Sequence, residues 1–575
     1  MFYILKKKIY LSLIVSLLAI VFTLSFGKYP NAFIVGSDIS KSKMERILDA
    51  PIHLDDDVMI TLRAGYKIKD IGFPAFNDTD IAQASTSYLS PYIFSVLEYI
   101  TKDNFAVIIY AILGIISVFF TFFIIMLYSK SIANAILILS ILTFSSTNLH
   151  YTLNGWDHLF QAFFLGLSLA IILNNEYSKK IMPLLAIFLA FGTLFRPDGI
   201  LIALSIVIFA ILQKKDSKEI IRKILLLAIP YMIFVISFIY LNYLYFGYIT
   251  PTTARLKIGA SPDILYSIKY ILNNGIFNIS AITICIFLFF IFIIFFKNYK
   301  TDKKIYIILI SVLITCFVAF INSDVFGGGR LYWSSAIILS ILFVVKSPSL
   351  FVFNLASFKN IISFNSLFFQ NINNRNLFSF LIIFILIFST FGNLINNIKN
   401  NIKNNVITVG NFYSSPTAQQ YIISKWINSN LDPKDGSIGF YYLGVSFHLP
   451  KFEIADFLGK ADESIAQTPV KWGPPGHNKW DEDISVQKWH PQVIVPPGRT
   501  DKSIEGRFQS SIKELNDKVD YGFAPSLMIS DIVNQNYTYC YLDNQFTGHE
   551  DKWGFYIRND ILSKHVNKLK CIKMN

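Results

Sequence analysis

Three consecutive carboxylates, Asp55, Asp56 and Asp57, are soon followed by Arg63, and these residue types suggest acid–base chemistry. Neighbouring carboxylates raise each other's pKa, which can make one of them a general base near neutral pH. We predict Asp56 as the base, with Asp57 second and Asp55 third. A solvated or helix-capping role stays open for two of the three. Arg63 is expected to pair with this run, and substrate binding is the alternative.

A divalent cation at Asp56 and Asp57 is another use of the same carboxylates, which are the ligands that hard cations prefer. Three adjacent acids do not define a coordination sphere, so no metal ligand is assigned. The sequence has neither Cys/His pairs with metal-binding spacing nor a phosphate-binding P-loop. No cofactor is therefore assigned, and a divalent cation stays open.

Basic residues stand in several short polar turns between apolar runs. The arginine fork suits phosphate, so four residues are candidates for binding a phosphate group: Arg196, Arg330, Lys257 and Arg255. Further substrate-binding candidates are Asp157, Asp198 and His477. Helix capping stays open for Arg196-Pro197-Asp198 and for Asp157, and interfacial snorkelling for Arg255 and Lys257.

The composition is that of a polytopic α-helical membrane protein. Of the 575 residues, 53% are hydrophobic and 15% charged, against roughly a quarter charged in soluble domains. About eleven membrane-spanning runs are expected, near 9–27, 105–127, 131–149, 157–174, 181–196, 198–212, 223–246, 276–296, 304–322, 331–346 and 377–395.

Lysines and arginines predict the orientation of these spans. Lys6, Lys7 and Lys8 precede the first run, which lacks a small-residue cleavage site and is expected to remain as a helix with a cytoplasmic N-terminus. With that orientation, every cytoplasmic loop is basic. The net charge of +13 is therefore a topology signal and no evidence for nucleic acid. We expect a multi-pass protein of a bacterial inner membrane, with the loop 28–104 on the outer face.

Residues 400–575 are polar and are expected to form an extracytoplasmic α/β or α+β domain, after a transmembrane domain at 1–399. Alternation predicts strands at 437–442 and 492–495, and a helix at 417–428. Cys540 and Cys571 lie in this domain, where both the disulfide and the free thiols stay open. Trp472, Trp480 and Trp489 could stack on sugar or form the core.

The order of these motifs resembles the GT-C superfamily of membrane glycosyltransferases, and within it the arabinofuranosyltransferases that use decaprenyl-phosphate-linked arabinose. Asp157 and Asp198 stand where that family has Glu, and Asp324 is displaced from the family's acid. The stretches that carry the resemblance are Asp56 to Arg63, Asn77 with Ser90-Pro91, Gly155-Trp156-Asp157, Arg196-Pro197-Asp198-Gly199, Phe246 to Gly259, Gly328-Gly329-Arg330, and Asp456 to Ala466 with Pro475-Gly476-His477.

This resemblance implies an inverting glycosyltransferase that moves a sugar from a polyprenyl-phosphate donor to a cell-envelope glycan acceptor at the outer face of the lipid bilayer. The sugar is arabinofuranose or another one, because the bias to Ile, Asn, Lys and Phe is unlike GC-rich arabinan-making bacteria. Three alternatives stay open: a lipid-linked glycan transporter, a membrane receptor, and a GT-C transferase that modifies protein or lipid A.

Overall fold

The computed structural model describes residues 2–26, 31–32, 52–101, 103–174, 179–213, 216–257, 264–272, 280–296, 303–322, 327–346, 416–470, 476, 479–496, 530–542, 554–564 and 569–572. Several predictions fall outside these residues, so they stay predictions: His477, Asp324, Trp472 and the span at 377–395.

The chain forms two compact units, each built from segments that are far apart in the sequence. The helical unit comprises Met1–Lys28, Ala111–Ile236 and Ile264–Ile402. The mixed unit comprises Tyr29–Tyr110, Ser237–Asp263 and Lys403–Asn575. The first loop therefore belongs to the same unit as the C-terminal residues. The predicted division near residue 400 stays a prediction, since residues 347–415 lie outside the described ranges.

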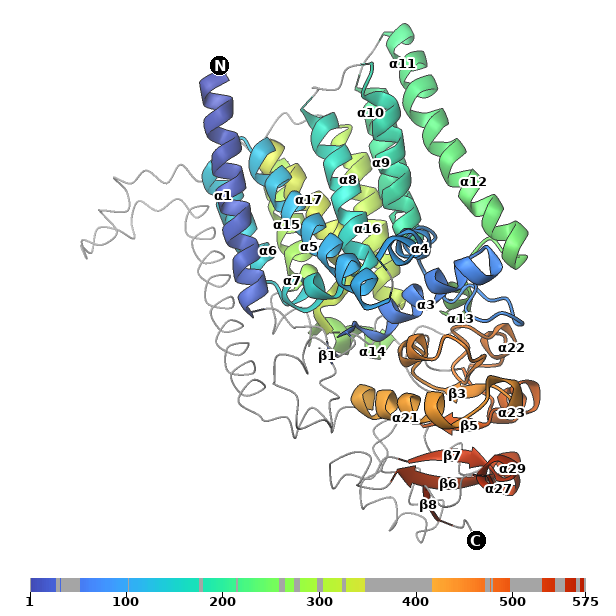
Figure 1. Cartoon of the computed structure of the whole chain (residues 1–575). Helices are drawn as coiled ribbons and strands as arrows, with labels where there is room; N and C mark the ends of the chain where they lie inside the picture. The colour runs from blue at the N-terminus through green and yellow to red at the C-terminus, as the bar shows by residue number, and fades with distance from the viewer. Residues whose placement is uncertain are drawn as a thin grey trace, which may run out of the picture. The chain divides into compact units, whose positions relative to one another are not determined.

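The helical unit contains the long apolar helices (Figure 1). Those that lie wholly or partly in it are α1 (Phe2–Phe26), α5 (Asp103–Tyr128), α6 (Ile132–Thr143), α7 (Ser146–Tyr151), α8 (Asp157–Leu173), α9 (Met182–Phe195), α10 (Ile200–Leu212), α11 (Ser217–Lys223), α12 (Ile229–Phe246), α14 (Ile264–Ile271), α15 (Ala281–Phe296), α16 (Ile305–Asn322) and α17 (Trp333–Lys346). The short helices η1 (Thr152–Asn154), η2 (Pro197–Gly199) and η5 (Gly327–Tyr332) form turns between them.

Four helical stretches are long and apolar enough to cross a membrane: Lys6–Ser25, Phe105–Tyr128, Ser217–Phe246 and Gly329–Lys346. The pair Ile132–Thr143 and Ser146–Asn154 bends by 52° and would make a fifth span if it crosses as one. Helices also occupy the remaining predicted positions within the described residues, but they are shorter. The described helices thus indicate a membrane protein, and the predicted number of about eleven spans is not confirmed.

Small residues let α8 pack closely against its neighbours. A Cβ atom on Gly192 of α9 would lie 2.6 Å from Leu165 Cδ2 of α8, and one on Gly166 of α8 would lie 2.9 Å from Ile341 Cδ1 of α17. Both distances are shorter than ordinary carbon contacts, so a side chain at either glycine would displace its neighbour. Close packing at small residues is the usual way in which membrane helices associate. This packing holds the middle of α8, whose first turn carries Asp157 and His158.

The mixed unit is built on a six-stranded sheet in the order β4-β3-β5-β7-β6-β8. The strands are β3 (Ile438–Phe440), β4 (Ile454–Asp456), β5 (Val493–Val495), β6 (Tyr537–Leu542), β7 (Gly554–Arg558) and β8 (Leu569–Ile572). β3 pairs in parallel with β4 and β5, and the remaining pairs are antiparallel. Cys540 of β6 and Cys571 of β8 form a disulfide. The mixed α/β character predicted for this segment is confirmed.

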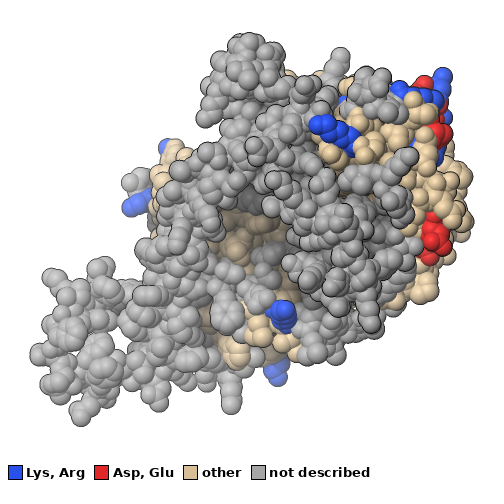
Figure 2. Space-filling model, turned by 90° about the horizontal axis from the view of Figure 1, so that it is seen from below, with Lys and Arg blue, Asp and Glu red and all other residues tan. Residues whose placement is uncertain are grey.

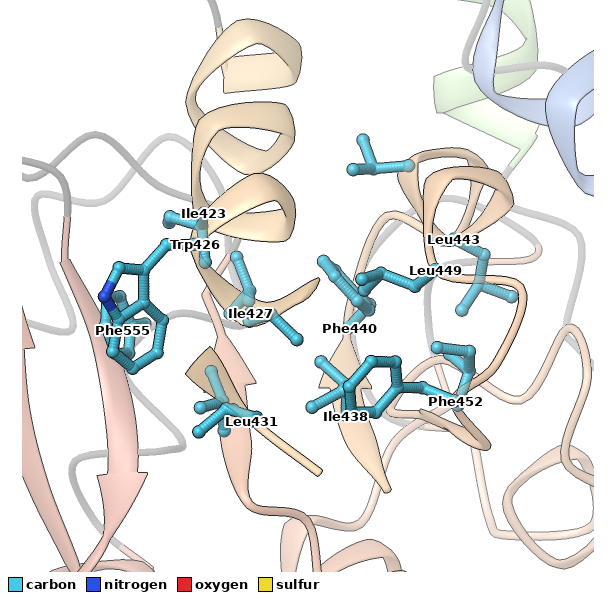
Figure 3. Close-up of a cluster of buried hydrophobic side chains, with 14 of the residues drawn as sticks. Ile423, Trp426, Ile427, Leu431, Ile438, Phe440, Leu443, Leu449, Phe452 and Phe555 are labelled. Carbon is cyan, nitrogen blue, oxygen red and sulfur yellow. The ribbon is translucent and has the colours of Figure 1, made fainter. Parts of the chain in front are cut away.

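Helix α21 (Pro416–Asn430) covers one face of this sheet, as Figure 3 shows. Its apolar side chains Ile423, Trp426 and Ile427 pack with Ile438 and Phe440 of β3 in one buried cluster. The predicted helix at 417–428 and strands at 437–442 and 492–495 are thus confirmed. Trp480 and Trp489 lie in a second buried core cluster, so they are core residues.

The remaining elements of the mixed unit surround the sheet and its loops. They are β1 (Asn31–Ala32), β2 (Ile52–His53), α3 (Asp56–Ile71), α4 (Ser90–Thr101), α13 (Thr252–Lys257), η7 (Pro433–Asp435), η8 (Gly444–His448), α22 (Glu463–Ala466), α23 (Glu482–Trp489), α27 (Asp531–Asn536) and α29 (Asn559–Leu562). Among the described residues visible in Figure 2, basic and acidic side chains form small groups that are mixed at one edge.

Candidate functional site

Two loops leave neighbouring parallel strands at the same edge of the sheet. β3 ends at Phe440 and leads to Gly444, and β4 ends at Asp456 and leads to Lys460. The carboxyl ends of parallel strands are where ligands usually bind in α/β sheets. The first turn of α3, with Asp56 and Asp57, lies against these two loops.

Helix α3 begins at this edge because its first residues suit a helix N-terminus. Asp55 is the N-cap residue, and its carbonyl accepts hydrogen bonds from the N–H groups of Val58 and Met59, both at 3.0 Å. Asp56 and Asp57 occupy the first turn, where the helix dipole favours negative charge. The helix ends at Gly72, whose φ of 84° glycine adopts readily. Asp55 therefore caps the helix through its backbone carbonyl and not through its carboxylate.

Asp56 is the acid held most directly by the sheet loops. The Gly444 N–H donates to its Oδ1 at 2.6 Å, and Lys460 Nζ lies 3.5 Å from its Oδ2. A Cβ on Gly444 would lie 2.7 Å from Oδ1, so the glycine is needed for this approach. The Asp56 side chain is 20% exposed, and each carboxylate oxygen has two lone pairs. The carboxylate can therefore accept a further hydrogen bond from solution.

The electrostatic surroundings of Asp56 suit a base. Burial raises the pKa of its carboxyl above the usual value. The charge of Lys460 opposes this, the charge of Asp57 raises the pKa further, and the Gly444 N–H lowers it. The net shift is upward, which brings the carboxyl closer to the pH at which proton transfer is efficient.

Lys460 connects the two acids and was missed by the sequence reasoning. Its ammonium lies 3.1 Å from Asp57 Oδ1, and its side chain is 8% exposed. Burial alone would lower the pKa of this ammonium, but the charges of Asp57 and Asp56 more than offset burial, so the pKa is raised. The only sequence signal was its position inside the stretch Asp456 to Ala466.

A buried aspartate shapes the loop that carries Lys460. The Asp456 carboxylate accepts hydrogen bonds from the N–H groups of Leu458, at 2.8 Å, and Ala461. Gly459 between them has a φ of 73°, and a Cβ there would lie 2.8 Å from Ala466 N. Burial raises the pKa of Asp456 and the two N–H groups lower it, and the net result is a pKa raised to about 7. The loop conformation therefore determines where Lys460 points.

Arg255 is held by the end of the same stretch. It forms an ion pair with Glu463, and its guanidinium stacks 3.3 Å from the centroid of the Tyr248 ring. Lys257 lies beside Gly476, where a Cβ would be 3.4 Å from Lys257 Cε. Arg255 thus has an acidic partner within the protein, which weakens its candidacy for a phosphate.

The prediction that Arg63 pairs with the Asp run is wrong. Its guanidinium is 1% exposed and donates to four backbone carbonyls, those of Phe76 at 3.1 Å, Ser446 at 2.6 Å, Leu449 at 3.1 Å and Phe452 at 2.8 Å. The carbonyls of Ser446 and Leu449 also accept backbone hydrogen bonds, from the N–H groups of Leu449 at 2.9 Å and Phe452 at 3.1 Å. The five-donor fork of arginine can serve several carbonyls at once. The side chain is buried, and the substrate-binding alternative for Arg63 stays a prediction.

The other predicted residues gather in the helical unit. Arg196 forms a two-pronged ion pair with Asp198, with Nη2 at 3.0 Å from Oδ2. Gln161 Nε2 on α8 donates to Asp198 Oδ1 at 2.9 Å and to the Arg196 carbonyl at 3.0 Å. A Cβ on Gly199 would lie 2.5 Å from Gln161 Nε2. The turn is therefore anchored to α8 within the helical unit, and Gln161 is a residue that sequence reasoning missed.

Arg330 lies at the end of α8 that carries Asp157 and His158. Its guanidinium is 4.2 Å from the centroid of the Trp156 ring, and its side chain is buried. The His158 ring is 6.0 Å from the same Trp156 ring, and the charges of both Arg196 and Arg330 act on it. Among the described residues, neither ring nitrogen of His158 has a hydrogen-bond partner. This cluster combines two guanidinium groups with a buried imidazole.

The carboxylates fit a divalent cation poorly. Within the described ranges, no three His, Cys, Asp or Glu side chains come together as a ligand set. Lys460 lies between Asp56 and Asp57, where a hard cation would need carboxylate oxygens without a competing ammonium. The donor set therefore does not suit the open divalent-cation alternative.

No protein-family model and no curated protein matches this chain. Two crystal structures of the Archaeoglobus fulgidus oligosaccharyltransferase are similar to it. The one tethered with an acceptor peptide containing the NVT sequon has 12% identity and a TM-score of 0.47, and covers 93% of this chain and 73% of that one. The complex with Zn and sulfate has 11% identity, a TM-score of 0.46 and coverages of 92% and 72%. At these values we draw no functional conclusion from the similarity.

Proposed function

We propose that this chain is an inverting membrane glycosyltransferase of GT-C type, which uses a polyprenyl-phosphate sugar at the extracytoplasmic face. The proposal rests on the position and surroundings of the Asp56 carboxylate. It is a partly exposed carboxylate at the carboxyl edge of a sheet, held by Gly444 and Lys460, with a raised pKa. The apolar helices supply the setting that a lipid-linked donor requires. The acceptor is a cell-envelope glycan, and the sugar is arabinofuranose or another.

In this mechanism Asp56 removes the proton from an acceptor hydroxyl, which attacks the anomeric carbon of the donor. The lipid phosphate leaves from the opposite face of the sugar, so the configuration inverts in one step. Charge develops on the phosphate as it leaves, and guanidinium groups placed beforehand stabilise that charge. Arg196 and Arg330 are the candidates for this role, with Lys257 and Arg255 behind them. The Arg330 guanidinium lies over the Trp156 ring, and Arg196 forms an ion pair with Asp198.

The direct test is turnover by the purified full-length protein in detergent or nanodiscs. It is given a panel of polyprenyl-phosphate pentoses and hexoses with glycan acceptors, and the product's anomeric configuration is determined. Inverted product with the free lipid phosphate supports the proposal. Binding of the donor lipid without any product, for every donor and acceptor, would favour a transporter or receptor. Product only with a peptide or lipid A acceptor would favour the third alternative.

Replacing Arg330 tests the phosphate role. Arg330→Gln should lower kcat by about 100- to 1,000-fold, the usual effect of removing a group that stabilises developing charge. Arg330→Lys should recover part of the rate, because the charge is kept while the flat fork is lost. Arg222→Gln serves as the matched control, because that arginine forms an ion pair with Glu219 on α11. If Arg330→Gln and Arg222→Gln retain equal kcat, the role is refuted.

The pH dependence of transfer should report on Asp56. The reaction needs the ionised carboxyl, so kcat/KM should rise with pH through a midpoint above the ordinary aspartate value of 3.8, since burial raises the pKa of Asp56. Lys460→Gln removes the positive charge that lowers this pKa, so the midpoint should move to higher pH. A midpoint that stays at the same pH in this variant would contradict the assignment of Asp56.

A further inference from the structure

The ammonium of Lys460 occupies the space that the two neighbouring carboxylates share. Its Nζ atom is 3.1 Å from Asp57 Oδ1 and 3.5 Å from Asp56 Oδ2, and the side chain is 8% exposed. Two carboxylates of one helical turn that face the same point are the kind of oxygen ligand that Mg²⁺ or Mn²⁺ takes up. In this chain a covalently attached cation stands at that point instead.

We propose that Lys460 is the resident cation of the Asp56–Asp57 pair, keeping divalent metal ions out and holding both carboxylates in place. The part of this inference that concerns proton removal by Asp56 rests on the proposed function. The exclusion of metal ions rests on the geometry of the three side chains alone. Lys460 acts through the two acids, so it is a positioning residue.

The loop around Lys460 holds its side chain in a defined position. The Asp456 carboxylate fixes the backbone on both sides of it through the N–H groups of Leu458 and Ala461. The tight turn at Gly459 sets the direction in which the next side chain leaves the loop. Lysine carries a compact charge on a flexible stem, and burial of that stem removes most of its freedom. The ammonium is therefore delivered to one position.

The charges of three acidic groups, Asp57, Asp56 and Asp456, act on the Lys460 ammonium. Without Lys460, the Asp56 carboxylate would keep the neutral Gly444 N–H as its hydrogen-bond donor and would lose the positive charge that it shares with Asp57. Such a pair would recruit a cation from solution, because unlike charges in a partly buried site interact more strongly than in water.

Mn²⁺ binding to the full-length protein tests the exclusion without any need for turnover. Binding is followed by electron paramagnetic resonance for the native protein, Lys460→Gln, Lys460→Arg and the double variant Lys460→Gln/Asp57→Asn. We expect Lys460→Gln to bind one Mn²⁺ at least about tenfold more tightly than the native protein, because a repelling charge is removed from two oxygen ligands. Lys460→Arg should resemble the native protein, and the double variant should lose the gained site.

The inference is overturned if the native protein binds Mn²⁺ as tightly as Lys460→Gln, or if the double variant keeps the gained affinity. If Lys460→Gln does not fold, the comparison of the native protein with Lys460→Arg and Asp57→Asn decides. Tight Mn²⁺ binding by the native protein that Asp57→Asn abolishes would refute the inference. Weak binding by all three would support it. If the protein shows no transferase activity, the proposed function fails while these Mn²⁺ results still stand.

A second measurement separates positioning from mere structural support. With glycosyl transfer as the readout, Mn²⁺ should restore at least about a tenth of the native rate to Lys460→Gln, because the recruited ion takes the place of the ammonium. It should leave the native rate unchanged. A purely structural lysine predicts that Mn²⁺ restores nothing, and that outcome would refute the positioning role.

Discussion

Asp56→Asn should lower kcat for glycosyl transfer by about a thousandfold, within the range that a general base contributes. The amide oxygen of asparagine can still accept the hydrogen bond from the Gly444 N–H, so the side chain stays in its place while the ability to take a proton is lost. The loss should appear in kcat with little change in donor binding. Single-turnover kinetics with a radiolabelled polyprenyl-phosphate sugar would measure it.

Its neighbours provide the matched controls. Asp57→Asn should lower kcat by at most about tenfold, since Asp57 contacts Lys460 and acts on Asp56 only through charge. Asp55→Asn should have a smaller effect, because the capping contacts use its backbone carbonyl. Equal rates for Asp56→Asn and the native protein would remove Asp56 from the mechanism. An equal loss in all three variants would show that the run acts only through its total charge.

Arg63→Met should destabilise the mixed unit by about 3–5 kcal/mol, the usual cost of removing one partner of a buried charged network. The carbonyls of Phe76 and Phe452 would lose the donor that Arg63 provides in a buried place. Those of Ser446 and Leu449 would keep only their backbone hydrogen bonds. Burial lowers the pKa of Arg63 to about 10, so the group is still charged at pH 7. Hydrogen exchange measured by mass spectrometry on α3 and β4 peptides would report the loss.

Arg222→Met is the matched control, because Arg222 forms an ion pair with Glu219 one turn away on α11. A surface pair of this kind contributes about 0.5 kcal/mol, so exchange should hardly change. Unaltered protection of α3 in Arg63→Met would contradict the stabilising role expected for the hydrogen bonds of Arg63. Faster exchange in the helical unit alone would also contradict it, since all four carbonyls belong to the mixed unit.

Local sequence patterns were enough for the elements but not for their contacts. The helix at 416–430 and the strands β3 and β5 were predictable, because side-chain alternation and helical spacing act over a few residues. Arg63 was misassigned because its partners are backbone carbonyls that lie 383 to 389 residues further along the chain, apart from that of Phe76. Backbone groups leave no signature in the choice of residue, so charge pairing with nearby acids was the natural but wrong expectation.

In the candidate site, too, the residue types were predictable from the sequence but their long-range contacts were not. The acids at 55–57 were conspicuous in the sequence, and the choice of Asp56 as the base stays a prediction. Its contacts with Gly444 and Lys460 could not be predicted, since a single glycine and a single lysine are common in loops. Arg196 and Asp198 stand two residues apart, so their ion pair was within reach of a local argument.

The long separation between Asp56 and Gly444 also sets an order of events during synthesis of the protein. Gly444 lies 388 residues after Asp56. Because ribosomes add roughly 5–20 residues each second, Gly444 is synthesised roughly 20–80 s after Asp56. During that interval Asp56 and Asp57 have neither the glycine nor the lysine that hold them. The contacts of Asp56 with Gly444 and Lys460 can therefore form only after the late sheet segment has been synthesised.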